Sequence, residues 1–373
     1  MLENKTTVVI LVYNSLKNLN MQKHQMNRRF FLSSGAVSAA GIMSASARDW
    51  TGKKPTRYPD PAIVSLDPRF DKYKLGNTPL QRLYTNPNRL WNEGCAWNAV
   101  GRYLVFSDVP GDLQLRWIED DNRVTVFRNP SGNSNGNTFD YQGRQISCQH
   151  GPRRVVRYEY DGTETVLASH FMGKKFNSPN DVIVHRNDDS IWFTDPTYGI
   201  ISDYEGQRSE PEQTGCFVYR VNSNLTKITA VARDFTKPNG ITFNSDETAL
   251  FISDTGRSHQ HDGPKHIRRL AVQQDGETLG ESMVFADCNA GLFDGFRIDT
   301  ENRVWTSASD GVHCFNPVGK LIGKIIIPEM VANVCFGGAS LNRLFIAGTT
   351  SIYSVYLTVT GQGAHTRFIK GNA

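Results

Sequence analysis

A hairpin-like segment recurs six times along the chain, and this repeat constrains the fold more than any other feature. In the stretch SPNDVIVHRNDDSIWFTDP (178–196), two apolar runs flank an acidic turn, and Asn180 at the entry precedes Asp195 at the exit by 15 residues. The same 15-residue offset bounds five other segments: Glu93 and Asp108, Asn135 and His150, Asn239 and Asp254, Asp294 and Ser309, and Asn333 and Gly348. Runs rich in β-branched and aromatic residues on both sides of a polar turn predict β-hairpins.

The spacing of the copies indicates how the hairpins assemble. Their first residues are separated by 42, 45, 59, 55 and 39 residues, and a further strand-like run, such as HIRRLAV or SIYSVYL, follows most copies. Periods of roughly 40–50 residues with four strands each are typical of propeller blades. We therefore predict an all-β fold, a six-bladed β-propeller over 80–373, in which the run LQRLYT (80–85) completes the last blade. A β-sandwich would not account for the fixed offset.

The first 47 residues are interpreted as a twin-arginine signal region. Arg28 and Arg29 precede a mildly apolar stretch of small residues that ends in Ala45-Ser46-Ala47, a sequence typical of a cleavage site. Because such signals begin near their arginines, translation is expected to start at Met21 or Met26, and a short exposed helix is the alternative reading. We expect a periplasmic protein with an extension at 48–79 before the propeller. A net charge of +4 with 21% charged residues gives no support for nucleic acid or membrane as a partner.

The six cysteines are interpreted as buried thiols. None forms a C-x-x-C pair, and each lies near an apolar run, where a free cysteine behaves as a small hydrophobic residue. An oxidising compartment leaves disulfides open as the alternative.

The first residue of each copy is a candidate ligand. In a propeller the inner strands line a central channel, so these residues gather at one mouth. They are two carboxylates and four carboxamides: Glu93, Asn135, Asn180, Asn239, Asp294 and Asn333. Each one alone could be a turn cap that binds its own backbone. Six together, all offering oxygen, favour a hard divalent cation such as Ca²⁺, Mg²⁺ or Mn²⁺ in the central channel.

The histidines divide into two groups. His259, His261 and His266 belong to a segment rich in turn residues and are interpreted as part of a solvated loop. His150 occupies the exit position of the second copy, so it either faces the mouth as a substrate ligand or proton carrier, or has no such role. The chain contains no G-x-S-x-G, G-x-G-x-x-G or P-loop motif, which gives no support to a serine hydrolase or a nucleotide enzyme.

Several ordered motifs resemble the gluconolactonase/regucalcin (senescence marker protein-like) superfamily, and its bacterial exported gluconolactonase branch most of all. They are EGCAWN…LVFSDVPG, SCQHGPRRVVRYEYDG, NSPNDVIVH…SIWFTDPTYG, KPNGITFNSDETALFISDTG, DGFRIDTENRVWTSASDG and VANVCFGG, which together cover nearly all of residues 80–357.

The resemblance implies one divalent metal ion at the mouth. By match to the family pattern, Glu93, Asn180, Asn239 and Asp294 would be the metal-binding residues, and Asp294 would also act as general base. Calcium is the first expectation, with zinc, magnesium and manganese as alternatives. The animal branch has an arginine where this chain has Ser178, so that branch's sugar contacts are not carried over.

The implied activity is metal-dependent hydrolysis of a sugar lactone, similar to glucono-1,5-lactone, to the aldonic acid. Asp294 and His150 would be catalytic, and Asn180 and His150 would bind the substrate. Two alternatives remain: another metal-dependent lactone or ester hydrolase on the same scaffold, and a non-catalytic calcium-binding propeller. The expected partner is a small-molecule sugar lactone, and the sequence leaves the oligomeric state open.

Overall fold

The computed structural model describes residues 48–88 and 90–362. The predicted signal region, with Arg28, Arg29 and the cleavage site at Ala47, lies outside the described residues. Within the described ranges, no helix has the length and apolar character needed to cross a membrane.

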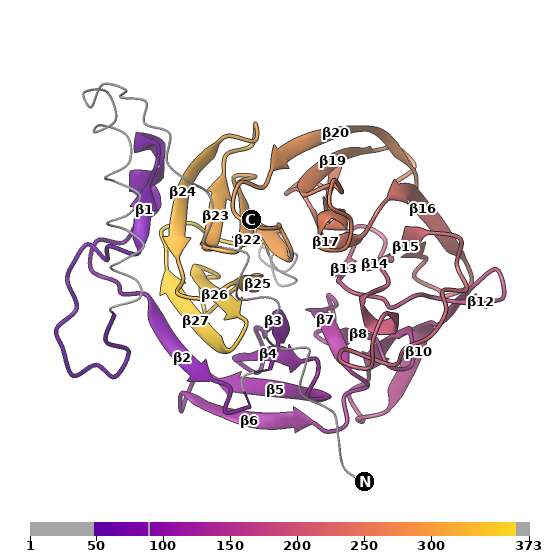
Figure 1. Cartoon of the computed structure of the whole chain (residues 1–373), viewed down its shortest axis with the longest axis horizontal. Coiled ribbons are helices and arrows are strands. Elements are labelled where there is room, and N and C mark those ends of the chain that lie inside the picture. The colour runs from indigo at the N-terminus through magenta and orange to yellow at the C-terminus, as the bar shows by residue number, and fades with distance from the viewer. Residues whose placement is uncertain (1–47, 89, 363–373) are drawn as a thin grey trace, which may run out of the picture. The chain divides into compact units, whose positions relative to one another are not determined.

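Six antiparallel sheets are arranged around a central axis, as the sequence repeat predicts (Figure 1). Given from the innermost strand outward, blade 1 is β3 (Asn92–Asn98), β4 (Tyr103–Asp108), β5 (Leu113–Ile118) and β6 (Arg123–Arg128), and blade 2 is β7 (Ser134–Phe139), β8 (Gln145–Gln149), β9 (Arg154–Tyr158) and β10 (Glu164–Ala168). Blade 3 is β13 (Val182–Val184), β14 (Ile191–Asp195), β15 (Cys216–Val221) and β16 (Ile228–Phe235), and blade 4 is β17 (Pro238–Phe243), β18 (Ala249–Asp254), β19 (His266–Val272) and β20 (Leu279–Asp287).

The last two blades each include a strand from the N-terminal part of the described chain. Blade 5 is β21 (Phe296–Ile298), β22 (Val304–Ala308), β23 (Gly311–Phe315), β24 (Leu321–Ile326) and β1 (Ile63–Ser65), and blade 6 is β25 (Val331–Gly337), β26 (Arg343–Gly348), β27 (Ser351–Tyr356) and β2 (Gln81–Thr85). The pairing of β2 with β27 confirms the predicted closure of the ring. The remaining short elements are β11 (His170–Phe171), β12 (Lys174–Lys175), η1 (Pro68–Tyr73), η2 (Tyr198–Ile200) and η3 (Gly256–Ser258).

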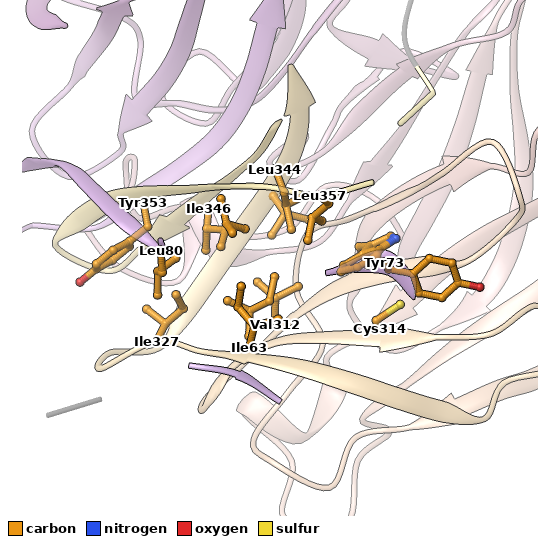
Figure 2. Close-up of a cluster of buried hydrophobic side chains, with 14 of the residues drawn as sticks. Ile63, Tyr73, Leu80, Val312, Cys314, Ile327, Leu344, Ile346, Tyr353 and Leu357 are labelled. Atoms are coloured by element: carbon orange, nitrogen blue, oxygen red, sulfur yellow. The ribbon is translucent and has the colours of Figure 1, made fainter. Parts of the chain in front are cut away.

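The extension at 48–79 packs onto blades 5 and 6. Ile63 pairs with Ile325 at the edge of blade 5, and Phe70 and Tyr73 of η1 join a buried apolar cluster with residues of both blades. Figure 2 shows Ile63 and Leu80 facing side chains of β23, β26 and β27 in this cluster. The extension therefore covers the junction at which the ring closes, a role that its sequence did not indicate.

The cysteines are free thiols in the described structure, as predicted. Five are buried and Cys216 is half-buried. Cys95, Cys148, Cys314 and Cys335 belong to the apolar clusters in which neighbouring blades pack together.

The two ends of the predicted hairpin have different roles in blades 3 and 4. The exit carboxylate of Asp254 accepts hydrogen bonds from the backbone N–H groups of Thr236 and Lys237, at 2.8 and 2.9 Å. Asp195 likewise accepts from the N–H of Asn177 at 2.9 Å. These carboxylates fix the segment that leads into the inner strand of their own blade, and the entry residues are left for the channel mouth.

Candidate active site

Five of the six predicted entry residues line one cavity at the channel mouth. This cavity has a volume of about 300 Å³, and its wall includes Glu93, Asn135, Asn180, Asn239 and Asp294, one from each of blades 1 to 5. The sixth, Asn333, lies behind the wall and donates a hydrogen bond from Nδ2 to Oε2 of Glu93 at 3.1 Å. The four residues expected to bind metal are therefore brought together, and their metal role stays a prediction.

Buried hydroxyls hold the backbone of three entry residues across the gap between blades. Ser107 Oγ donates to the carbonyl oxygen of Asn135 at 2.8 Å. Thr194 Oγ1 donates to that of Asn239 at 2.7 Å, and Ser253 Oγ to that of Asp294 at 3.0 Å. Each hydroxyl stands one residue before the exit position of its hairpin, so blades 1, 3 and 4 each fix the entry residue of the next blade.

A glycine beside the entry residue allows the inner strands to approach closely. At Gly240, a Cβ atom would lie 2.3 Å from the carbonyl oxygen of Asp294. At Gly136, a Cβ atom would lie 2.3 Å from the carbonyl oxygen of Asn180, to which the N–H of Gly136 donates at 2.7 Å. A side chain at either position would push the neighbouring entry residue away from the cavity.

The carboxylates of the cavity are electrostatically unfavourable when ionised together. Burial raises the pKa of Glu93 to about 7, although the N–H of Gly94 and the amide of Asn333 stabilise its charged form. Burial, and then the charge of Glu93, raise the pKa of Asp294 well above its usual range. Among the described residues that line the cavity, none is Lys or Arg. The site therefore holds protons at these carboxyl groups or binds a cation.

The donor set fits a hard divalent cation. Glu93 and Asp294 carry the two negative charges that would balance it, and Asn180 and Asn239 supply amide oxygens. Within the described ranges, no three His, Cys, Asp or Glu side chains are placed to hold a metal ion. This agrees with a site of two carboxylates completed by carboxamides and does not suit a zinc centre built from Cys and His.

His150 lies behind the cavity wall and not in it. Its side chain is fully buried, and burial lowers its pKa to about 4, so the imidazole is neutral at physiological pH. Its Nδ1 lies 3.1 Å from the carbonyl oxygen of Glu205, which can only accept, so Nδ1 carries the proton. Nε2 then accepts from the amide of Asn135 at 3.4 Å. His150 reaches the cavity through Asn135, and its predicted catalytic and substrate-binding roles stay predictions.

Sequence reasoning missed the residues that reach the mouth from the insertion after β14. Tyr198, Ser202, Tyr204 and Glu205 line the cavity from this segment. Burial raises the pKa of Glu205 to about 7. The unusual length of the third repeat marks an insertion, but a repeat cannot show where an inserted loop folds.

Comparison with known proteins gives a consistent result. A curated gluconolactonase from Zymomonas mobilis is 27% identical over 316 residues, which cover 79% of this chain and 85% of the relative. A solved structure from Xanthomonas campestris, described as a gluconolactonase important in glucose secondary metabolic pathways, is 34% identical with a TM-score of 0.73, covering 79% of this chain and 94% of that chain. The calcium-binding protein regucalcin from Agrobacterium tumefaciens shares the fold at 17% identity, with a TM-score of 0.61 over 75% of this chain and 94% of that chain.

The family model for the SMP-30/gluconolactonase/LRE-like region matches residues 91–350. This range contains every residue that lines the mouth cavity. The match confirms the resemblance seen in the sequence motifs, and the chain belongs to the SMP-30/gluconolactonase/LRE-like family.

Proposed function

We propose that this protein hydrolyses a sugar lactone of the glucono-1,5-lactone type to the aldonic acid. The observation that carries the proposal is the cavity in which Glu93 and Asp294 lie among carboxamides on a gluconolactonase-type propeller. The gluconolactonases among the relatives support this substrate class. No observation favours a non-catalytic calcium-binding propeller or a hydrolase of other esters.

One divalent cation would be held by Glu93, Asn239 and Asp294, with Asn180 beside them. Calcium is our first choice because the ligands are all oxygen and a calcium-binding relative shares the fold, and magnesium, manganese and zinc are the alternatives. When bound, such a cation polarises a lactone carbonyl and stabilises the negative charge that develops on its oxygen.

Asp294 is proposed to move the protons. Its carboxylate accepts a proton from the water molecule that attacks the lactone carbonyl. The ring C–O bond then breaks, and the ring oxygen takes up, as it leaves, the proton that Asp294 accepted. His150 is neutral and would act by accepting from Nδ2 of Asn135, which orients that amide at the cavity. The products are the aldonic acid and the regenerated site.

Replacing Asp294 by asparagine tests this assignment. The substitution keeps the shape and one oxygen of the side chain and removes the base and one of the two charges. We expect kcat/KM for D-glucono-1,5-lactone to fall by about 10²–10⁴-fold at saturating metal, with circular dichroism unchanged. Asp287→Asn, whose carboxylate on β20 is 72% exposed, is the matched control and should retain full activity. Activity of Asp294→Asn within about tenfold of the wild type would refute the assignment of the base.

We also propose that the protein is exported to the periplasm through the twin-arginine route. The support is the pair Arg28-Arg29 followed by Ala45-Ser46-Ala47. Replacing both arginines by lysine should leave the protein in the cytoplasm, as measured by cell fractionation. An unchanged periplasmic yield would contradict the proposal.

A further inference from the structure

The segment 198–209, called the mouth loop here, covers part of the cavity from blade 3. The two ends of the loop are joined by a hydrogen bond from the N–H of Ser209 to the carbonyl oxygen of Ile200 at 3.0 Å. At the start of the loop, the hydroxyl group of Tyr198 forms hydrogen bonds with Thr255 Oγ1 (2.7 Å) and Ser258 Oγ (2.9 Å) on blade 4. The loop is therefore tied to two blades, and the side chains that it places in the cavity wall have defined positions.

His150 of blade 2 holds the tip of the mouth loop. The proton on its Nδ1 is donated to the carbonyl oxygen of Glu205. The ring packs so closely on Gly199 that a Cβ atom there would lie 2.6 Å from it. A buried neutral imidazole thus fixes the backbone of Glu205, which turns the side chain of this residue toward the cavity.

The Glu205 carboxyl group is near the metal-binding residues without joining them. It lines the same cavity as Glu93 and Asp294, and its charge raises the pKa of both. Yet Glu93, Asp294 and Glu205 do not form a three-carboxylate metal group among the described residues. Glu205 therefore belongs to the part of the cavity wall that the mouth loop supplies, where it can contact a ligand bound in the cavity.

We propose that Glu205 is a substrate-binding residue that accepts hydrogen bonds from ring hydroxyls of the sugar lactone, and that His150 is its positioning residue. The inference rests on the proposed function, because it names the part of the site that recognises the sugar. A carboxylate is an acceptor with about four lone-pair sites, so it can bind two neighbouring hydroxyl groups at once. A lactone without hydroxyl groups gives it nothing to bind.

The first test compares two lactones in wild type and Glu205→Gln. D-glucono-1,5-lactone carries ring hydroxyls, and δ-valerolactone has the same ring without them. We expect KM for the sugar lactone to rise about tenfold, since a charge-assisted acceptor is lost, while kcat stays within about threefold. For δ-valerolactone, kcat/KM should stay within about twofold. Glu210→Gln, at an exposed position that is not part of the cavity wall, is the matched control and should behave as wild type.

Two results of this test would overturn the proposal. Equal losses on both lactones would place Glu205 in the chemical step or at the metal. Unchanged KM for the sugar lactone would show that Glu205 does not contact the substrate.

The second test asks whether His150 acts through Glu205. His150→Ala should raise KM for the sugar lactone in the wild-type background and add nothing in the Glu205→Gln background. His150→Asn, whose Nδ2 can replace the donor at Nδ1, should restore KM. If His150→Ala instead lowers kcat on both lactones, or if its effect multiplies with that of Glu205→Gln, the positioning role is wrong.

A binding measurement separates this inference from the proposed function. D-glucono-1,5-lactam has the ring and hydroxyls of the sugar lactone with an amide in place of the ester, and piperidin-2-one lacks the hydroxyls. Calorimetry should show at least about fivefold weaker binding of the sugar lactam to Glu205→Gln than to wild type. If wild type hydrolyses no lactone, the proposed function fails while this difference still supports Glu205. Equal binding of the sugar lactam to both proteins overturns the inference even if hydrolysis is observed.

Discussion

Replacing Thr194 by valine tests whether buried hydroxyls hold the cavity residues in place. Thr194 is fully buried on β14. Its Oγ1 donates to the carbonyl oxygen of Asn239 at 2.7 Å and accepts from the N–H of Asp181 at 3.1 Å, so it links the entry segments of blades 3 and 4. Valine has almost the same shape, and the change therefore removes the hydrogen bonds with little effect on packing.

The expected loss of stability follows from the two groups that lose this partner. A buried polar group left without its partner costs about 1–3 kcal/mol. The methyl group that replaces the hydroxyl offsets about 1 kcal/mol of this through burial. For the two groups together, we expect the free energy of unfolding to fall by about 1–5 kcal/mol, and Tm to fall by about 2–4 °C for each kcal/mol lost. Because Asn239 is released, the affinity for calcium should also fall.

Thr125→Val is the matched control. The hydroxyl of Thr125 on β6 is buried but has no hydrogen-bond partner among the described residues, so its removal should leave Tm unchanged or raise it. Differential scanning calorimetry at one scan rate gives Tm, and calorimetric titration gives calcium affinity. If Thr194→Val and Thr125→Val have the same Tm and the same calcium affinity, the hydroxyls do not position the site.

Further predictions concern close packing, pH and metal removal. Gly240→Ala should lower Tm and activity because the new methyl group meets the carbonyl oxygen of Asp294, at a cost of about 1–3 kcal/mol. Gly76→Ala, which has open space around it, is the control and should change neither. Equal Tm values for the two variants would contradict the packing argument. Burial raises the pKa of Glu93 to about 7, so protons compete with the cation for this carboxylate. Calcium affinity should therefore fall as the pH is lowered through that value. An affinity that is independent of pH would exclude Glu93 as a ligand. Chelation should lower Tm, because a ligand that binds the folded state at about 100 times its Kd stabilises it by about 2.7 kcal/mol; an unchanged Tm would argue against a bound ion.

The repeat predicted the fold because the inner hairpin has a constant geometry. Two strands and a turn separate the entry from the exit, and the 15-residue offset from Asn180 to Asp195 returns wherever a blade repeats that hairpin. Convergence of the entry residues followed from the same symmetry, and five of the six line one cavity. The exception is Asn333, whose amide donates a hydrogen bond to Glu93 instead of lining the cavity. The repeat could not predict this one hydrogen bond.

Contacts made by insertions could not be predicted from the repeat. Glu205 reaches the mouth because two hydrogen bonds hold its loop. His150 donates to the carbonyl oxygen of Glu205, 55 residues along the chain, and the N–H of Ser209 donates to the carbonyl oxygen of Ile200, 9 residues before it. The strand β1 was missed for a related reason. It is three residues long, Ile63–Ser65, and it exists because the edge of blade 5 offers it a partner, not because its own sequence requires a strand.

The chemistry of the mouth arises where the chain departs from its repeat. All six entry residues of this chain carry a side-chain oxygen. A ring of six carboxamides would nevertheless be neutral and would bind a divalent cation weakly. Carboxylates at Glu93 and Asp294, in blades 1 and 5, supply the charge that such a cation needs. The insertion in blade 3 then brings a third acid, Glu205, that the repeat does not contain. Substitutions at these three positions should therefore change activity far more than fold, whereas substitutions of the hydroxyls and glycines that repeat from blade to blade should reduce both together.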